Sequence, residues 1–202
     1  MSLKLRHSPA SPFVRKVRVF AHEVGLSDRI ELMPTDVWAL DSDIHHDNPL
    51  GKVPALVTGE GTFIGSALCC EYLDTLHHGR RLIPATAPER WAALYLHALA
   101  DGIMESAVAH VVERLRRPKE MVFQGNLDRQ ETKMRHALDR IETRATALKD
   151  RVDIGTITLG CALAYLDFRL PQLTWRDHRP AMTLWYAGFA ERPSMTTTRP
   201  AL

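Results

Sequence analysis

The sequence changes character near residue 80, and this change limits the folds open to the chain. Before it, short apolar segments alternate between two-residue and helical spacing, with turn residues between them. The segments predicted as strands are Leu3–Leu5, Ile30–Met33, Val53–Val57 and Thr62–Ile64. Helices are predicted at Pro12–Gly25 and Ser66–Leu76. This order, β-α-β followed by β-β-α, indicates a small sheet with helices packed on it.

Beyond residue 88 only helical spacing remains. Apolar residues recur every three or four positions from Trp91 to Leu115 and from Asn126 to Leu148, and Pro180–Arg192 forms a last predicted helix. The segment 153–170 is apolar on nearly every side, as expected of a helix at the centre of a bundle, and Asp153 with Thr156 gives it a capping pattern. We therefore predict an α/β domain over residues 1–78, a linker over 79–87 and an all-helical domain over 88–202.

Composition narrows the class of protein. A chain of 202 residues is long enough for two small cores, and 45% hydrophobic with 25% charged residues is ordinary for a globular protein. The net charge of +2 does not indicate a nucleic-acid or membrane partner, and the basic cluster at 114–119 is typical of a solvated helix end. The longest apolar stretch is too short to span a bilayer.

Cysteine usage indicates a reducing compartment. The three cysteines, Cys69, Cys70 and Cys161, form neither a disulfide framework nor a zinc pattern, and Cys69 and Cys70 lie in an apolar run. No apolar core of a signal peptide follows the first methionine. We expect a cytoplasmic protein with no metal.

The first motif that could carry chemistry lies between the first strand and the first helix. It reads Ser8-Pro-Ala-Ser11-Pro12-Phe13, in which Ser11 suits the N-cap and Pro12 the first helical position. A helix N-terminus stabilises an anion, and a serine hydroxyl there can donate to a thiolate. Simple capping remains the alternative interpretation of Ser11.

The second and third motifs also leave two interpretations open. Val53-Pro54 enters a strand, and a cis peptide there would leave the backbone of Val53 free to pair with an extended ligand, whereas a trans proline would only start the strand. Gly65-Ser66 opens the next helix, with Ser66 predicted as its N-cap and as a second carboxylate site.

Taken together, these motifs resemble the glutathione transferase superfamily, in a bacterial, serine-type or omega- or zeta-like form. The resemblance covers nearly the whole chain and is most specific in the segment from Asn48 to Leu56, which reads Asn-Pro-Leu-Gly-Lys-Val-Pro-Ala-Leu. It implies a thioredoxin-like domain followed by a helical bundle. It also implies glutathione as cosubstrate, a small hydrophobic electrophile as second substrate, and a homodimer.

The resemblance assigns roles residue by residue. Ser11, or alternatively Ser8, would stabilise the glutathione thiolate; Val53 before Pro54 would pair with its cysteinyl part, Lys52 would lie near its glycine end, and Ser66 would hold its γ-glutamyl carboxylate. Phe13 and Gly65 belong to the same predicted site. Tyr95 and Met104 are candidates for the electrophile pocket, and Asp101 for a site completed by a second subunit, where Gly102 would permit close packing.

Two positions depart from the usual family pattern. Gly65 stands where relatives carry an acidic residue that meets the γ-glutamyl ammonium, so a charge-assisted hydrogen bond of about 1.5–3 kcal/mol is expected to be missing. His7 stands where an aromatic residue is frequent, and we expect it to be a hydrogen-bonded strand histidine.

The predicted function is activation of the glutathione thiolate for attack on small electrophiles, by conjugation or peroxide reduction, as in detoxification. Because Ser11 is not cysteine, a mixed disulfide with glutathione cannot form there. The competing hypothesis is a glutathione-binding or regulatory protein that keeps the fold without catalysis.

Overall fold

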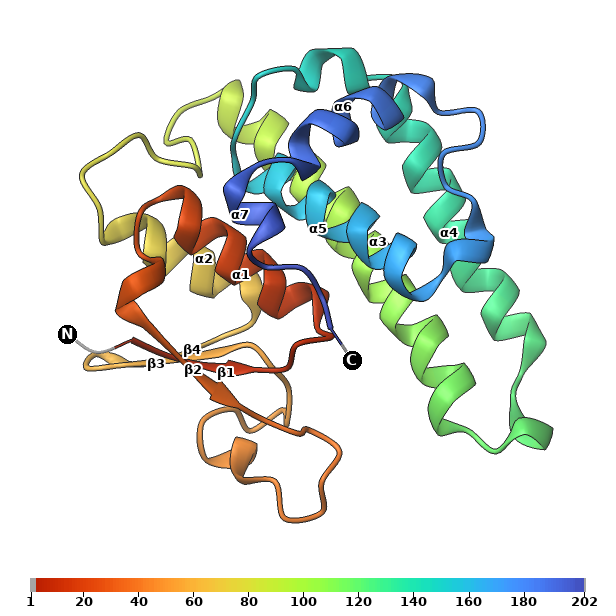
Figure 1. Cartoon of the computed structure of the whole chain (residues 1–202), viewed down its shortest axis with the longest axis horizontal. Helices are drawn as coiled ribbons and strands as arrows, with labels where there is room; N and C mark the ends of the chain where they lie inside the picture. The colour runs from red at the N-terminus through yellow and green to blue at the C-terminus, as the bar shows by residue number, and fades with distance from the viewer. Residues whose placement is uncertain (1–2, 202) are drawn as a thin grey trace. The chain divides into compact units, whose positions relative to one another are not determined.

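The computed structural model describes residues 3–201, which group into two compact units. The first comprises residues 1–85 together with 193–202, and the second comprises residues 86–192. The last ten residues therefore belong with the first unit, a grouping that local sequence patterns do not predict. The course of the chain can be followed in Figure 1.

A four-stranded sheet forms the base of the first unit, in the order β2-β1-β3-β4. Its strands are β1 (Leu3–His7), β2 (Ile30–Pro34), β3 (Ala55–Thr58) and β4 (Gly61–Ile64). β1 runs parallel to β2, whereas β3 is antiparallel to both β1 and β4. β3 begins at Ala55 and not at Val53 as predicted, because Pro54 has no N–H to give to a ladder.

Successive side chains of β1 point to opposite faces of the sheet, and a different part of the chain packs on each face. Leu3 and Leu5 are fully buried on one face, which helices α1 (Pro12–Glu23) and α2 (Ser66–Thr75) cover (Figure 1). Arg6 points to the other face, where it binds Asp43 and Asp47 of the segment around the short helix η2 (Asp43–His46). The pleat thus places the core on one side and this ion-pair cluster on the other.

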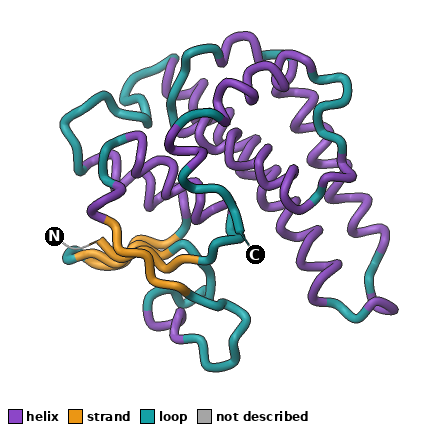
Figure 2. The backbone as a smooth tube through the Cα atoms, in the orientation of Figure 1, coloured by secondary structure: helices purple, strands orange, loops and turns teal. Residues whose placement is uncertain are grey.

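Helices make up the regular structure of the second unit (Figure 2). They are α3 (Glu89–Arg116), α4 (Gln124–Glu142), α5 (Ile154–Arg169) and α6 (Pro180–Ala190). Every residue from Ile154 to Leu166 is buried, which confirms α5 as the central helix. The helix predicted over Asn126–Leu148 stops at Glu142 and continues as a short 3₁₀ turn, Ala145–Leu148.

The start of α5 is capped as the sequence predicts. Asp153 accepts hydrogen bonds from the N–H groups of Gly155 and Thr156, and the Thr156 hydroxyl accepts from the Asp153 N–H. Gly155 lets the first turn approach α3 closely, since a Cβ there would lie 2.6 Å from the Ala93 carbonyl oxygen. Packing at this contact therefore requires glycine.

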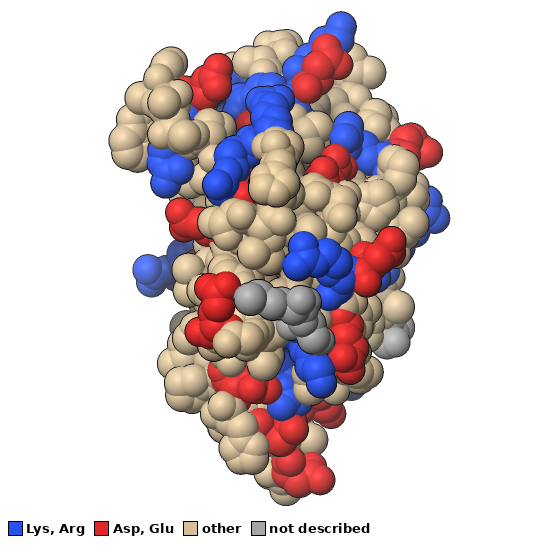
Figure 3. All heavy atoms as spheres, turned by 90° about the vertical axis from the view of Figure 1, so that its left-hand side faces the viewer, with Lys and Arg blue, Asp and Glu red and all other residues tan. Residues whose placement is uncertain are grey.

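Charges of both signs are interspersed on the molecular face drawn in Figure 3. This face carries no broad field of a single sign, in keeping with the net charge of +2. Within residues 3–201, no helix combines the length and apolarity needed to cross a membrane.

Candidate functional site

The sheet register brings the three sequence motifs to one edge of the first unit. Arg6 pairs with Ala55, and Ala55 pairs with Ile64, so the end of β1, the beginning of β3 and the end of β4 are neighbours. The N–H of Gly65 donates to the carbonyl of Pro54 at 3.3 Å, which joins the second and third motifs directly. Motifs that lie far apart in the sequence are thus neighbours at one end of the sheet.

The loop between β1 and α1 places a hydroxyl at a helix N-terminus. Ser11 is the N-cap of α1, and its Oγ accepts from the Val14 N–H at 3.3 Å. The Ser11 N–H closes a turn onto the Ser8 carbonyl at 3.1 Å. Because Ser11 uses Oγ only as an acceptor here, its hydroxyl proton remains available to a sulfur anion. Capping and thiolate binding are therefore compatible roles.

The Val53–Pro54 peptide is cis, as one of the two interpretations predicts. Among residues 3–201, no backbone group pairs with the N–H or C=O of Val53. The preceding loop is ordered by Asn48, whose amide donates to the Lys52 carbonyl at 2.7 Å and accepts from the Leu50 N–H. Lys52 itself is exposed. An extended peptide could therefore pair with Val53 beside a well-ordered loop.

The start of α2 differs from the prediction for Ser66. Gly65 is the N-cap, with φ +79°, and Ser66 is the first helical residue, so the prediction that Ser66 is the N-cap is wrong. The reason is the positive φ, which glycine adopts without the cost that a Cβ adds. The Ser66 side chain is 6% exposed and makes no hydrogen bond within the described part of the chain. Its hydroxyl and the first N–H groups of α2 together can receive a carboxylate.

His7 closes β1 next to this loop, and the expectation of a hydrogen-bonded ring is not met at one nitrogen. Its Nε2 is buried and has no partner among the described residues. Burial lowers the pKa of His7, and the nearby Arg18 lowers it further. The imidazole is therefore held in its neutral form.

The candidates for an electrophile pocket in the second unit differ in their exposure. Met104 is completely buried in the core of the second unit, so it does not line an open surface. Tyr95 is 45% exposed, with the Arg144 guanidinium 5.3 Å from its ring centre, and Asp101 is partly exposed. Phe13, in the first unit, lies 6.0 Å from the Lys16 ammonium.

The cysteines do not offer an alternative nucleophile. Cys69, Cys70 and Cys161 are buried, and no disulfide joins them. Burial raises the pKa of Cys69 to about 12, far above the range in which a thiolate is present at neutral pH. No group of three metal-ligating side chains occurs within residues 3–201.

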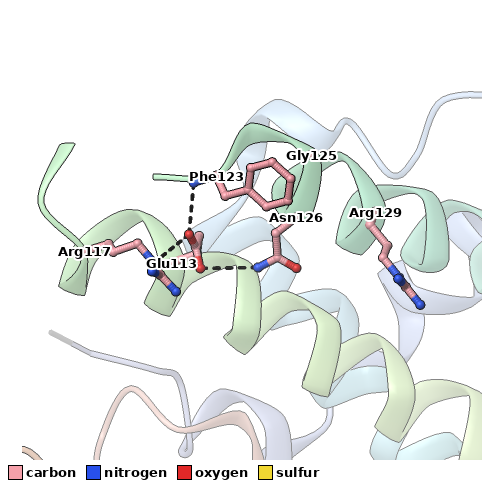
Figure 4. Close-up of a pocket in the computed structure, with 6 residues that line it drawn as sticks. All are labelled: Glu113, Arg117, Phe123, Gly125, Asn126 and Arg129. Carbon is pink, nitrogen blue, oxygen red and sulfur yellow. Dashed lines mark hydrogen bonds and ion pairs between the residues drawn. The ribbon is translucent and has the colours of Figure 1, made fainter. Parts of the chain in front are cut away.

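A pocket lies at the corner between α3 and α4, and Figure 4 shows its lining. Glu113 of α3 accepts from the Phe123 N–H, the Asn126 amide and Arg117. These donors hold the pKa of Glu113 below its usual range, with the Phe123 N–H contributing most. The carboxylate thus caps α4 from a neighbouring helix, which is a structural task. No local sequence signal indicates it, since α4 has no side-chain N-cap of its own.

Comparison with known proteins gives matches in both halves of the chain. The family model of the glutathione S-transferase N-terminal domain matches residues 10–76, and that of the C-terminal domain matches residues 124–188. A relative from Escherichia coli K12, the uncharacterized GST-like protein YibF, is 33% identical over 98% of both chains. Glutathione S-transferase 3 of Zea mays is 26% identical over 99% of this chain and 94% of its own.

A solved structure is similar to this chain over its full length. A glutathione transferase family member from Pseudomonas fluorescens Pf-5, crystallised with bound glutathione, is 43% identical over all of both chains, with a TM-score of 0.95. The predicted fold class is confirmed: a thioredoxin-like unit with a mixed sheet, and a helical unit.

Proposed function

Because the chain belongs to the glutathione S-transferase family, we propose that it binds glutathione in its first unit and activates the thiol for attack on small electrophiles. The observation that carries the proposal is that three sets of polar groups, each with hydrogen-bonding capacity left for a ligand, meet at one end of the sheet. These are the Ser11 hydroxyl, the backbone of Val53 and the Ser66 end of α2.

Each of these groups matches one part of the tripeptide. The N–H and C=O of Val53 pair with the cysteinyl backbone in the manner of an added strand. The hydroxyl of Ser66 and the N-terminus of α2 receive the γ-glutamyl carboxylate. Lys52, which is exposed, lies near the glycine carboxylate. Bound in this way, the tripeptide directs its sulfur toward the β1–α1 loop.

Activation requires that the protein lower the pKa of the glutathione thiol. A free thiol has a pKa of about 8.5, and lowering it by two units requires about 2.7 kcal/mol of preferential stabilisation of the anion. A charge-assisted hydrogen bond from Ser11 and the N-terminus of α1 together provide a contribution of this size. Ser8, across the turn, is the alternative donor.

In a conjugation the thiolate forms a bond to an electrophilic carbon, and the leaving group departs with its electron pair. The thiol proton is released to solvent before the attack. With a peroxide, the thiolate sulfur attacks one oxygen, the O–O bond breaks and the other oxygen leaves as an alcohol after protonation. The sulfenic acid formed on glutathione then reacts with a second glutathione, which releases water and leaves glutathione disulfide. We place this chemistry in the cytoplasm and in a homodimer, with Asp101 and Gly102 near the subunit contact.

A non-catalytic glutathione-binding protein is the second candidate. Gly65 favours it, because this residue has no side chain to meet the γ-glutamyl ammonium and thus weakens the expected affinity. The two candidates share a binding site and differ only in what happens to the sulfur.

Retention on immobilised glutathione, followed by ultraviolet titration of the bound thiol, separates the candidates. We expect retention and a thiol pKa well below 8.5, restored toward the free value in Ser11→Ala. Ser8→Ala is the matched control, because it removes a hydroxyl from the same loop. Retention with an unshifted thiol would favour the non-catalytic candidate, and a change only in Ser8→Ala would move the role to Ser8.

A further inference from the structure

The last residues of the chain fold back along α1 of the first unit (Figure 1). The Ser194 hydroxyl donates to Glu23 at 2.5 Å, and the Thr198 hydroxyl donates to the Ser194 carbonyl at 2.6 Å. Ser194, Met195 and Thr198 are all buried. This segment is therefore a packed part of the unit.

Arg15 of α1 depends on this segment for its hydrogen bonds. Its side chain is 6% exposed; Nη2 donates to the Met195 carbonyl at 3.0 Å, and Nε donates to the Thr198 hydroxyl at 3.4 Å. Its Nη1 has no partner among the described residues. A buried guanidinium needs acceptors, and here the C-terminal segment supplies them. The segment and α1 are thus held in register one turn beyond Ser11.

The end of the segment reaches the loop between β1 and α1. The Ala201 N–H donates to the Pro9 carbonyl at 3.4 Å, between the two candidate hydroxyls of Ser8 and Ser11. Within the loop itself, the Ser11 N–H donates a hydrogen bond to the Ser8 carbonyl. The contact at Pro9 therefore holds the loop from outside.

We propose that the segment Ser194–Ala201 is a positioning element for the thiol-activating loop. It fixes the loop through Ala201 on Pro9 and fixes the adjoining turn of α1 through Arg15. The inference rests on the proposed function, because it concerns the geometry of the hydrogen bond from the loop to the glutathione sulfur. Val53 and Ser66, which bind the peptide part, lie outside this loop, before β3 and at the start of α2. Loss of the segment thus weakens activation and leaves affinity for glutathione nearly unchanged.

Two variants test this role by different routes. Deletion of residues 200–202 removes the contact at Pro9, and Thr198→Val removes the hydroxyl that Arg15 binds while keeping the shape of the side chain. Thr197→Val is the matched control, since the Thr197 hydroxyl is exposed and donates only to the Pro193 carbonyl. Circular dichroism establishes that each variant is folded.

We expect both test variants to raise the pKa of the bound thiol by about half a unit to one unit, which reduces the ratio of thiolate to thiol about threefold to tenfold. The turnover number falls in parallel, the dissociation constant of glutathione stays within about twofold, and Thr197→Val matches the unaltered chain. A thiol pKa and turnover number unchanged in both folded variants would overturn the inference.

Amide hydrogen exchange distinguishes failure of this inference from failure of the proposed function. Exchange at Ala10 and Ser11 should accelerate on deletion of residues 200–202, whether or not glutathione is present. Unchanged exchange overturns the positioning role by itself. Faster exchange in a chain that does not bind glutathione would instead contradict the proposed function.

Discussion

At the start of α2, Gly65 is the N-cap and Ser66 offers a hydroxyl to a ligand, whereas the sequence assigns both roles to Ser66. Gly65 takes the capping position with φ +79°, and Ser66 is left with its hydroxyl unpaired within the described chain. The Ser11 cap was predictable because N-cap chemistry is local, as it depends on a serine followed by proline. The Gly65 conformation depends on how β4 passes into α2, so residue type alone did not indicate it.

Substitution of Gly65 tests the missing contact to the γ-glutamyl ammonium. Open space surrounds the position, but its φ costs about 1 kcal/mol for a residue with a Cβ. We expect Gly65→Asp to lower the melting temperature and to tighten glutathione binding by about tenfold, as a charge-assisted bond would. Gly65→Asn is the control for backbone cost without the charge. If calorimetry gives the same affinity for glutathione in the two variants, the γ-glutamyl ammonium does not lie opposite residue 65.

His7 makes the stability of the first unit depend on pH. Its folded pKa lies below the unfolded value of about 6.5, because burial and Arg18 disfavour the imidazolium. The unfolded chain therefore binds the proton more readily, so this contribution to stability is present above about pH 6.5 and is lost as the pH falls.

His7→Phe should flatten that dependence and remove the unpaired buried Nε2. We expect its free energy of unfolding to exceed that of the unaltered chain, by a margin that grows between pH 7 and pH 5. His136→Gln, at an exposed position of α4, should leave the dependence unaltered. A constant margin across this range would show that His7 titrates normally.

At the scale of elements, the sequence predicts the helices and strands well where the signal is local. The α5 helix is an example, since both its capping box and its apolar run lie within one segment. Glu113 is a counterexample, because it caps α4 from α3 and its partners lie beyond a turn. The start of β3 at Ala55 has a different cause, because it follows from the missing N–H of Pro54, which is a local feature.

Two glycines in the helical unit should respond oppositely to alanine. At Gly155 a Cβ would lie 2.6 Å from the Ala93 carbonyl oxygen and 2.9 Å from the Leu96 Cβ, so Gly155→Ala should destabilise by about 1–3 kcal/mol. Gly102, inside α3, has nothing within 4 Å, so Gly102→Ala should stabilise a single subunit by about 0.5–1 kcal/mol.

Chemical denaturation measures both effects, and sedimentation measures the oligomeric state of the Gly102 variant. Weaker assembly in Gly102→Ala would place this glycine at the proposed subunit contact. A Gly155→Ala variant as stable as the unaltered chain would show that α3 and α5 can separate at no cost.

At the scale of the whole molecule, the grouping of the chain end with the first unit is what local sequence reasoning missed. The contact between Pro9 and Ala201 joins residues at opposite ends of the chain, and no periodicity or motif connects them. The three motifs of the candidate site were found because each has its own local chemistry, and the sheet register then brings them together. The sequence predicts the three motifs of the candidate site, whereas long-range contacts determine how rigidly these motifs are held.

The most direct test of the central claim is the ultraviolet titration of glutathione bound to the unaltered protein. Thiolate absorbance is followed against pH with saturating glutathione, and the same titration is repeated with Ser11→Ala. We expect a bound thiol pKa well below 8.5 in the unaltered protein and a value near that of free glutathione in the variant. A bound thiol that titrates like free glutathione in the unaltered protein would contradict the central claim.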